Sequence, residues 1–507
     1  VPWMLHLMAV HGADIDEISY ETDRLQFIGR GRTAADPQAL SGDAASPGAS
    51  SGRLSGSQGS VLDPIVAIRY AIMLDPQQTV IIDMVTGMAE SRAAVLGLVE
   101  KYHDRQLADR VFELAWTHAQ VVLRQLNASE ADAQLYGRLA NSVVYANASL
   151  RADAGTLMQN RRGQSGLWGY AISGDLPIVL LQIGDAANIE LVRQLVQAHA
   201  YWRLKGLAVD LVIWNEDRAG YRQLLQDQII GLIAGGVEAH VIDRPGGIFV
   251  RPAEQISNED RMLFESGARI ILGDSRGTLA EQINRRHLRE VRVPRLQPTR
   301  SHRAEVQAGP EPMRDLILHN GLGGFTPDGH EYVITTTAAQ VTPAPWVNVL
   351  ANAHFGTVIS ENGLAYTWSE NAHEFRLTPW HNDPVSDASG EAFYLRDEES
   401  GHFWSPTPLP SRGANAYVSR HGFGYSVFEH NEGGIVSELW VYVALDAAVK
   451  FSVLKVRNAS GRQRRLSATG YVEWVLGDLR SKSTMHVTTE EDSDSGALFA
   501  RNRYNTE

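Results

Sequence analysis

The C-terminal part of the sequence places tryptophan beside side chains that carry planar polar groups. Pyranose sugars stack their C–H faces on aromatic rings, and their hydroxyl groups hydrogen-bond to amides and carboxylates. This composition predicts sugar contact, although the chain has 11 tryptophans in 507 residues and any one of them could instead fill a β-sandwich core. The candidates are Trp346, Asn348, Trp368, Trp380, Asn382, Asp383 and Trp404.

A candidate anion site lies near the start of the chain, at Arg30-Gly31-Arg32. Two guanidinium groups could bind phosphate, and the glycines would let backbone amides approach it. The alternative is structural: the two arginines would form ion pairs with Glu21 and Asp23 at the edge of a sandwich.

Acidic and amide residues follow the apolar runs in the middle of the chain. Asp185, Asn215, Asp243 and Asp274 each come just after a predicted parallel strand. The carboxyl ends of such strands form the ligand crevice of open α/β sheets, so these residues could hold a sugar or a metal. The same residue types also cap helices, and that explanation stays open.

The sequence supports no catalytic residue and no metal site. His373-Glu374 and His381 lack the spacing that puts two imidazoles on one helical face, and the chain has no cysteine. Lysine and arginine are dispersed over a chain of net charge -13, which disfavours nucleic-acid binding. No apolar run approaches the ~18 residues that a membrane helix needs.

The elements that must position these residues change type along the chain, which predicts a multidomain α+β protein. Residues 1–90 alternate short strands with turns and predict a partial β-sandwich, interrupted by a Ser/Gly-rich loop at 41–60. A period of 3.6 predicts a helical region over 91–169. Residues 286–315 form a linker, and the short strands of 316–507 predict an antiparallel β-supersandwich.

Residues 170–285 predict an α/β domain with a parallel sheet. Apolar strands alternate with amphipathic helices there, which is typical of a parallel sheet with right-handed crossovers. We expect strands at 176–183, 209–214, 238–242 and 269–272, and helices at 188–204, 221–234 and 258–266.

Longer motifs carry a family resemblance. Thr342–Asn348, Leu377–Pro384 and Arg420–Tyr425 resemble the N-terminal supersandwich of glycoside hydrolase family 94, the inverting sugar phosphorylases. Gly163–Pro177 and Tyr201–Ile213 are similar to the C-terminal half of bacterial cyclic β-1,2-glucan synthases.

The resemblance implies that the chemistry lies outside this chain. In the phosphorylases an aspartate of a later (α/α)6 barrel is the general acid and inorganic phosphate attacks, and no residue here corresponds to that aspartate. We therefore expect a fragment that is inactive alone and holds no cofactor, from a parent with glycosyltransferase and phosphorylase regions. Residues 1–90 would end a first sandwich and 316–507 begin a second.

The implied partners are a β-1,2-glucan chain, the downstream barrel and a second copy in a homodimer. The parent would lie in the bacterial inner membrane, with this region on its cytoplasmic face. Three functions remain open: a glucan-binding scaffold, a dimerisation or interaction module, and a self-contained carbohydrate-active enzyme that uses the α/β crevice.

Overall fold

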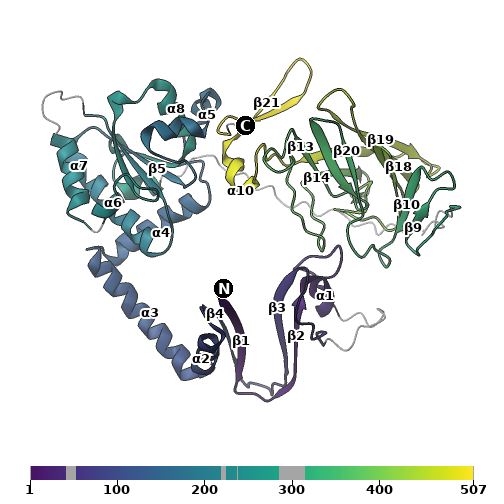
Figure 1. Ribbon diagram of the computed structural model, residues 1–507, viewed down its shortest axis with the longest axis horizontal. Coiled ribbons are helices and arrows are strands. Elements are labelled where there is room, and N and C mark those ends of the chain that lie inside the picture. Colours follow the sequence, from purple (N-terminus) through teal and green to yellow (C-terminus); the bar gives the residue numbers. More distant parts are fainter. Residues whose placement is uncertain (1, 42–52, 218–223, 237, 285–313, 506–507) are drawn as a thin grey trace. The chain divides into compact units, whose positions relative to one another are not determined.

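The computed structural model describes residues 2–41, 53–217, 224–236, 238–284 and 314–505. Most of the expected loop at 41–60 and of the expected linker at 286–315 lies outside these residues. The chain divides into two compact units: unit 1 comprises Val1–Leu114 and Gln297–Glu473, and unit 2 comprises Ala115–Leu296 and Trp474–Glu507. The mixed α+β fold class predicted from the sequence is confirmed (Figure 1).

The N-terminal stretch of unit 1 consists of two antiparallel strand pairs and short helices. β1 (Trp3–His11) pairs with β4 (Ile81–Ala89), and β2 (Ile15–Asp23) pairs with β3 (Pro64–Ile72). Asp23 ends β2 and caps α1 (Arg24–Ile28), because its carboxylate accepts the Leu25 N–H at 2.9 Å. α2 (Arg92–Tyr102) and α3 (Arg105–Gln125) follow β4.

The rest of unit 1 is built from antiparallel sheets. The six-stranded sheet has the order β19 (Lys450–Asn458), β18 (Ile435–Val443), β17 (Tyr425–Glu432), β16 (Tyr417–Gly422), β10 (Glu331–Thr336), β9 (Gly323–Phe325). Two three-stranded sheets have the orders β11 (Val347–Ala351), β12 (Phe355–Ser360), β13 (Ala365–Ser369) and β15 (Phe403–Trp404), β14 (Glu391–Asp397), β20 (Leu466–Val472).

Alternation of buried and half-buried residues explains how these sheets pack. In β18, every second residue from Ile435 to Val441 is buried. Leu439 and Val441 join Phe428 of the neighbouring β17 and Leu350 and Ile359 of the three-stranded sheet in one apolar core. The sandwich is therefore held by side chains that face inward from two sheets.

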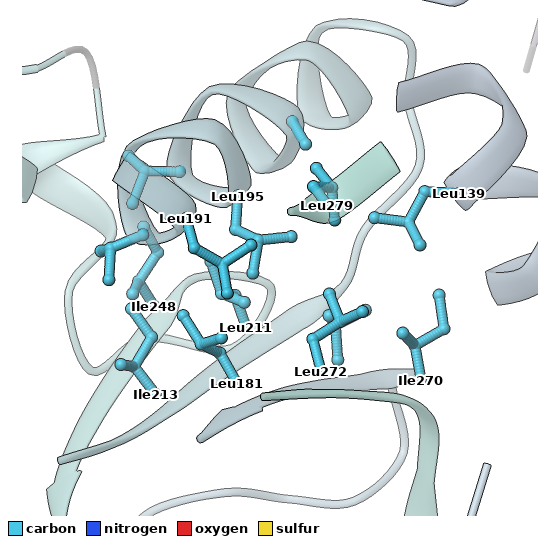
Figure 2. Close-up of a cluster of buried hydrophobic side chains, with 14 of the residues drawn as sticks. Leu139, Leu181, Leu191, Leu195, Leu211, Ile213, Ile248, Ile270, Leu272 and Leu279 are labelled. Carbon is cyan, nitrogen blue, oxygen red and sulfur yellow. The ribbon is translucent and has the colours of Figure 1, made fainter. Parts of the chain in front are cut away.

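Unit 2 contains a four-stranded parallel sheet with helices on both faces (Figure 1). Its order is β7 (Ile248–Pro252), β6 (Asp210–Asn215), β5 (Ile178–Ile183), β8 (Ala268–Gly273). Figure 2 shows the apolar core on one face, where strand residues such as Leu181 and Ile213 meet helix residues such as Leu191 and Leu195. That core is closed by α4 (Glu130–Val144), α6 (Ile189–Leu204), α7 (Leu224–Ala234) and α9 (Leu279–Asn284).

The opposite face of the parallel sheet is covered by α8 (Asn258–Gly267), which packs against α5 (Ala154–Gln159). Leu263 and Phe264 of α8 are buried with Leu180 and Val212 of the sheet. Both faces of the strands are thus apolar, which is why their sequences are continuous apolar runs.

One strand prediction was wrong. Residues 238–242 contain a 3₁₀ turn at Ala239–Val241 and no strand. The strand that follows β6 in the chain is β7, which begins six residues beyond Ile242. Two glycines explain the shift: Gly246 has φ +73°, and a Cβ on Gly247 would lie 1.9 Å from the Val241 carbonyl oxygen. The chain therefore turns tightly at these glycines before the strand begins.

Residues 474–505 pack in unit 2, whereas the sequence analysis placed them with the preceding sandwich. They form α10 (Arg480–Ser483), β21 (Val487–Glu491) and β22 (Leu498–Asn502). The Tyr504 hydroxyl donates to the Gly174 carbonyl at 3.0 Å, and the Arg503 Nη1 donates to the Asn160 carbonyl at 2.6 Å. The domain boundaries drawn from the sequence stay predictions.

Among the described residues, no helix combines the length and the apolar character that crossing a bilayer requires.

Candidate carbohydrate-binding surface

Three aromatic residues of unit 1, Tyr366, Trp368 and Trp380, form what we call the aromatic ledge. The Trp380 ring stacks on Tyr366 with ring centroids 4.5 Å apart and an interplanar angle of 15°. Trp368 tilts against Tyr366 at 5.3 Å. Tyr366 is only 3% exposed, whereas Trp380 is 41% exposed. A buried ring thus holds an exposed indole in place, which is the arrangement that stacking on a sugar requires.

The other two predicted tryptophans are less available. Trp404 is 1% exposed and stacks on His402, so it belongs to the sandwich core. Trp346 is half-buried: its ring meets Tyr332 edge-on at 5.9 Å, and its backbone N–H donates to Glu361 at 2.7 Å.

Of the predicted asparagines, Asn348 is held inside the sandwich and Asn382 is exposed. The Asn348 side chain donates to the carbonyls of Gly422 and Tyr425, each at 2.9 Å, and to the Ser426 hydroxyl at 3.2 Å. These bonds tie β11 to β16 and β17, so Asn348 is a structural residue. Asn382 follows the ledge, is exposed, and adopts φ +47°, a conformation that asparagine tolerates at a turn.

Asp383 is engaged with the N-terminal stretch of unit 1. Arg24 forms a bidentate pair with it, from Nη1 to Oδ1 at 2.7 Å and from Nη2 to Oδ2 at 2.9 Å. Arg24 holds the pKa of the Asp383 carboxyl well below its usual range, and the backbone N–H groups of Ser386 and Val385 act in the same direction. The pair joins two segments that lie more than 350 residues apart in the sequence.

Arg30 lies in a buried polar network, with its guanidinium 5% exposed. Its Nη2 donates to Glu361 Oε1 at 3.0 Å and to Asp387 Oδ2 at 2.8 Å. The sequence-based pairing with Glu21 and Asp23 was therefore wrong. Asp23 caps α1, and Glu21 accepts hydrogen bonds from Ser55 and Ser57.

Glu361 is the centre of this network. Burial raises its pKa, and the hydrogen bond from Thr342 and the charge of Arg30 counter that effect. Asn362 Nδ2 donates to both carboxylates, at 3.0 Å to Glu361 and 2.9 Å to Asp387. An anion at Arg30 would therefore lie beside two carboxylates, although Nε and Nη1 of the guanidinium have no hydrogen-bond partner among the described residues.

Arg32 is more accessible than Arg30. Its Nη1 donates to the Ser41 hydroxyl at 2.9 Å and lies 3.7 Å from Asp36. An anion role for Arg32 stays a prediction, since it would have to compete with Asp36 in solvent.

The carboxyl ends of the parallel strands bring only some of the predicted residues together. Asp274 accepts the backbone N–H groups of Gly184 and Asp185 at 2.9 and 3.0 Å, so Asp185 and Asp274 are neighbours. Asn215 donates to Gln226 at 3.1 Å. Asp243 precedes β7 instead of following a strand, because the predicted strand is a turn, and it pairs with Arg251 at 2.8 Å.

The chemistry available in unit 1 is therefore stacking and hydrogen bonding. Across the described ranges, no group of three histidine, aspartate or glutamate side chains is arranged to hold a metal ion. In the aromatic ledge two of the predicted residues, Trp368 and Trp380, lie against the same tyrosine, and Trp380 is exposed.

Residues 1–105 and 330–507 match the model of the glycosyl hydrolase 94 supersandwich domain. The chain belongs to this family. The family 94 match covers both stretches that Arg24 and Arg30 connect, and it leaves out the α/β domain. The resemblance predicted from the sequence is confirmed.

Individual relatives agree with the family 94 assignment. The chain is 33% identical to the cyclic beta-(1,2)-glucan synthase NdvB of Rhizobium meliloti over 514 aligned residues. The alignment covers 98% of this chain and 18% of NdvB. It is also 33% identical to the N,N'-diacetylchitobiose phosphorylase of Vibrio furnissii over 36% of this chain and 24% of the relative. For the solabiose phosphorylase of Paenibacillus borealis, the identity is 31% over 31% of this chain and 20% of the relative.

The chain thus spans between 18% and 24% of the length of these three relatives. Sequence reasoning missed the residues that organise the site, namely Tyr366, Glu361, Asp387 and Arg24. Tyr366 could have been found from the alternation in β13, because it lies two residues before Trp368 on the same face. No local signal identifies the partners of Arg24 and Arg30.

Proposed function

We propose that this chain is the scaffold and carbohydrate-binding part of a phosphorylase-like region in a cyclic β-1,2-glucan synthase. The similarity to NdvB over 98% of the chain supports the parent, and the family 94 match supports the scaffold. In this proposal the parent lies in a bacterial inner membrane with this region on the cytoplasmic face. Inorganic phosphate is the co-substrate of the larger protein.

The observation that carries the binding role is the exposed face of Trp380. The indole is held by Tyr366 and does not have to be ordered when a ligand arrives, which lowers the entropic cost of binding. Asn382 beside it offers an exposed amide for sugar hydroxyls. The ligand in this proposal is a linear β-1,2-glucan, and the ledge stacks on one glucose ring.

Calorimetry with linear β-1,2-glucan tests this role. Trp380→Ala removes the exposed ring, and we expect the dissociation constant to rise about tenfold, as the loss of one stacking contact predicts. The matched control is Trp168→Ala in unit 2, whose ring is 63% exposed and should leave binding unchanged. Equal binding by the wild type and the Trp380 variant would falsify the ledge as the sugar contact.

Catalysis lies outside this proposal. In the described ranges the helices cover a parallel sheet or follow the N-terminal strands, and they form no (α/α)6 barrel. We expect the purified chain, incubated with β-1,2-glucan and phosphate, to release no glucose 1-phosphate above the blank. Sustained turnover would instead support the self-contained enzyme, which has lost Asp243 from its crevice but keeps Asp185, Asn215 and Asp274.

An interaction module is a second candidate, and the β1–β4 pair favours it. Met4, Met84 and Met88 of this two-stranded ribbon are exposed, together with Trp3. Exposed methionine and tryptophan side chains at this density are typical of a protein-binding surface. Light scattering separates the two functions: a dimer that dissociates on Met84→Lys and does not bind glucan would favour the interaction module.

A further inference from the structure

A small pocket in unit 2 lies where the C-terminal segment meets α5 and α8. It is lined by Leu157, Asn160, Ser266, Met485, His486, Thr488, Arg503 and Tyr504. The His486 ring stacks on Tyr504 with centroids 4.0 Å apart and closes one wall. The family 94 residues proposed to bind sugar all lie in unit 1, so this pocket is independent of them.

Two residues of this pocket carry hydroxyl groups that have no hydrogen-bond partner within the part of the chain that the structure describes. Ser266 is 4% exposed, and its Oγ is buried without a hydrogen bond. The Thr488 Oγ1 is buried in the same state. Buried hydroxyls almost always have a partner, and both of these residues line the pocket, so their hydroxyl groups are available to donate to a small hydrogen-bond acceptor there.

Three arginines lie in or near the pocket, and the carboxylates that act on its lining residues do so from a distance, Glu490 on Arg503 and Asp175 and Asp210 on Tyr504. Arg503 lines it and Arg151 lies behind His486, where its Nη2 donates to the Met485 carbonyl at 2.7 Å and its Nε is buried without a partner. No carboxylate of the described residues forms an ion pair with Arg151, Arg269 or Arg503. The nearby Glu490 is paired with Arg501 at 3.3 Å.

His486, which lines the pocket, is affected by the charges of two nearby arginines. Burial lowers the pKa of His486 to about 3, and the charges of Arg151 and Arg269 add to the effect. Burial and the charge of Arg269 also lower the pKa of Arg151. Buried cations without a counter-charge cost free energy, and an anion among them would remove that cost.

We propose that this pocket binds a small inorganic anion of the size of chloride. The pocket has room for about one water-sized particle, and a halide is the simple anion closest to that size. Ser266, Thr488 and Arg503 hold the anion, and Arg151 and Arg269 supply the field that selects it over water. Because Thr488 and Arg503 belong to the C-terminal segment, the anion fastens that segment to the α/β domain.

The direct test uses crystals of the 507-residue chain grown in bromide, which replaces chloride and is visible by anomalous diffraction. We expect an anomalous peak within hydrogen-bond distance of Thr488 Oγ1. In solution, the melting temperature should rise with the logarithm of the chloride concentration, as expected for a ligand that binds the folded state. Sodium gluconate and sodium phosphate at equal ionic strength are the comparison arms, and neither should give the same rise.

Two variants remove donors while the fold is kept. Thr488→Val preserves side-chain shape, and we expect it to weaken the chloride dependence about tenfold, the effect of losing a charge-assisted hydrogen bond. Arg503→Gln should abolish it. The matched controls, Thr489→Val and Arg501→Gln, alter neighbouring residues of the β21–β22 hairpin that do not line the pocket and should leave the dependence intact.

Several outcomes would overturn the proposal. These are a rise with phosphate but not chloride, a chloride-dependent rise without a bromide peak in the pocket, a bromide peak at crystal concentration only, and a chloride dependence that is unchanged in both Thr488→Val and Arg503→Gln.

Discussion

Each unit holds an arginine that is largely withdrawn from solvent, Arg30 in unit 1 and the half-buried Arg151 in unit 2, but their surroundings differ. In unit 1, Arg30 faces the carboxylates of Glu361 and Asp387, which are themselves tied down by Asn362. In unit 2, the hydrogen-bond partners of Arg151 among the described residues are the backbone carbonyls of Ser266 and Met485. The difference teaches that a buried guanidinium is a structural clamp where acids meet it and a candidate ligand site where they do not.

Replacement of Arg30 gives the largest expected effect. Arg30→Met leaves Glu361 and Asp387 buried beside each other without the cation that hydrogen-bonds to both, and we expect the free energy of unfolding of unit 1 to fall by about 3–5 kcal/mol. Urea denaturation followed by hydrogen exchange in β12 and β13 measures it. Arg32→Met is the control and should change the value by less than about 0.5 kcal/mol. If Arg30→Met and Arg32→Met lowered the unfolding free energy by similar amounts, the pairing of Arg30 with its two carboxylates would not stabilise unit 1, and the comparison between the units would fail.

The acidic counterpart in unit 2 is Asp210, which is fully buried with one oxygen unpartnered. Burial raises its pKa to about 6, against the opposing effects of the Gly246 N–H and of His199. Between pH about 4 and 6 the folded state therefore holds a proton that the unfolded state has lost. The stability contribution is complete below pH about 4 and is lost as the pH rises toward 6.

The loss at Asp210 amounts to roughly 2–3 kcal/mol across that window. Asp210→Asn removes the titration, so the difference in unfolding free energy between wild type and variant should change with pH by this amount. Asp227→Asn, at an exposed position of α7, should leave the pH profile unchanged. If the unfolding free energies of wild type and Asp210→Asn changed with pH in the same way, ionised Asp210 would cost no stability. The contrast between the paired charges of unit 1 and the unpaired charges of unit 2 would then be weaker.

The smallest expected effect belongs to the partly exposed pair of Arg24 and Asp383. Arg24→Met should lower the stability of unit 1 by about 1 kcal/mol at neutral pH, since solvent screens the pair. Arg24 depresses the pKa of Asp383, so its contribution is present above the unfolded value of about 4 and is lost as the pH falls below it. Denaturation at pH 7 and pH 3 checks this. If Arg24→Met lowered the unfolding free energy as much as Arg30→Met does, the expectation that the more buried ion pair contributes more stability would be wrong.

Sequence patterns predicted elements best where burial was two-sided. The continuous apolar runs around Leu180 and Val212 predicted the parallel strands β5 and β6 to within one or two residues. The prediction failed at residues 238–242, where β-branched residues precede two glycines. Glu238 is buried there, and its carboxylate bonds to His199 at 2.6 Å and to Arg203 at 2.7 Å. No local sequence pattern predicts these contacts.

The candidate site was predicted in composition but not in arrangement. Seven residues had the right chemistry for sugars, and the structure assigns them three different situations: Trp380 and Asn382 are exposed, Trp346, Trp368 and Asp383 are half-buried, and Trp404 and Asn348 are held by the sandwich. Period-two alternation tells which residues share a face of a strand, but which face is covered depends on the neighbouring sheet.

By itself, the sequence determined the family, the mixed fold class and the existence of the parallel sheet, because motifs and periodicity are local properties of the chain. Only the tertiary structure decided which charges meet. Arg30 pairs with acids 331 and 357 residues away, whereas Arg151 and Arg503 form no ion pair with any carboxylate of the described residues. Contacts over such separations are set by how the sheets and helices pack, and burial then decides whether an arginine serves as a clamp or as a binding site.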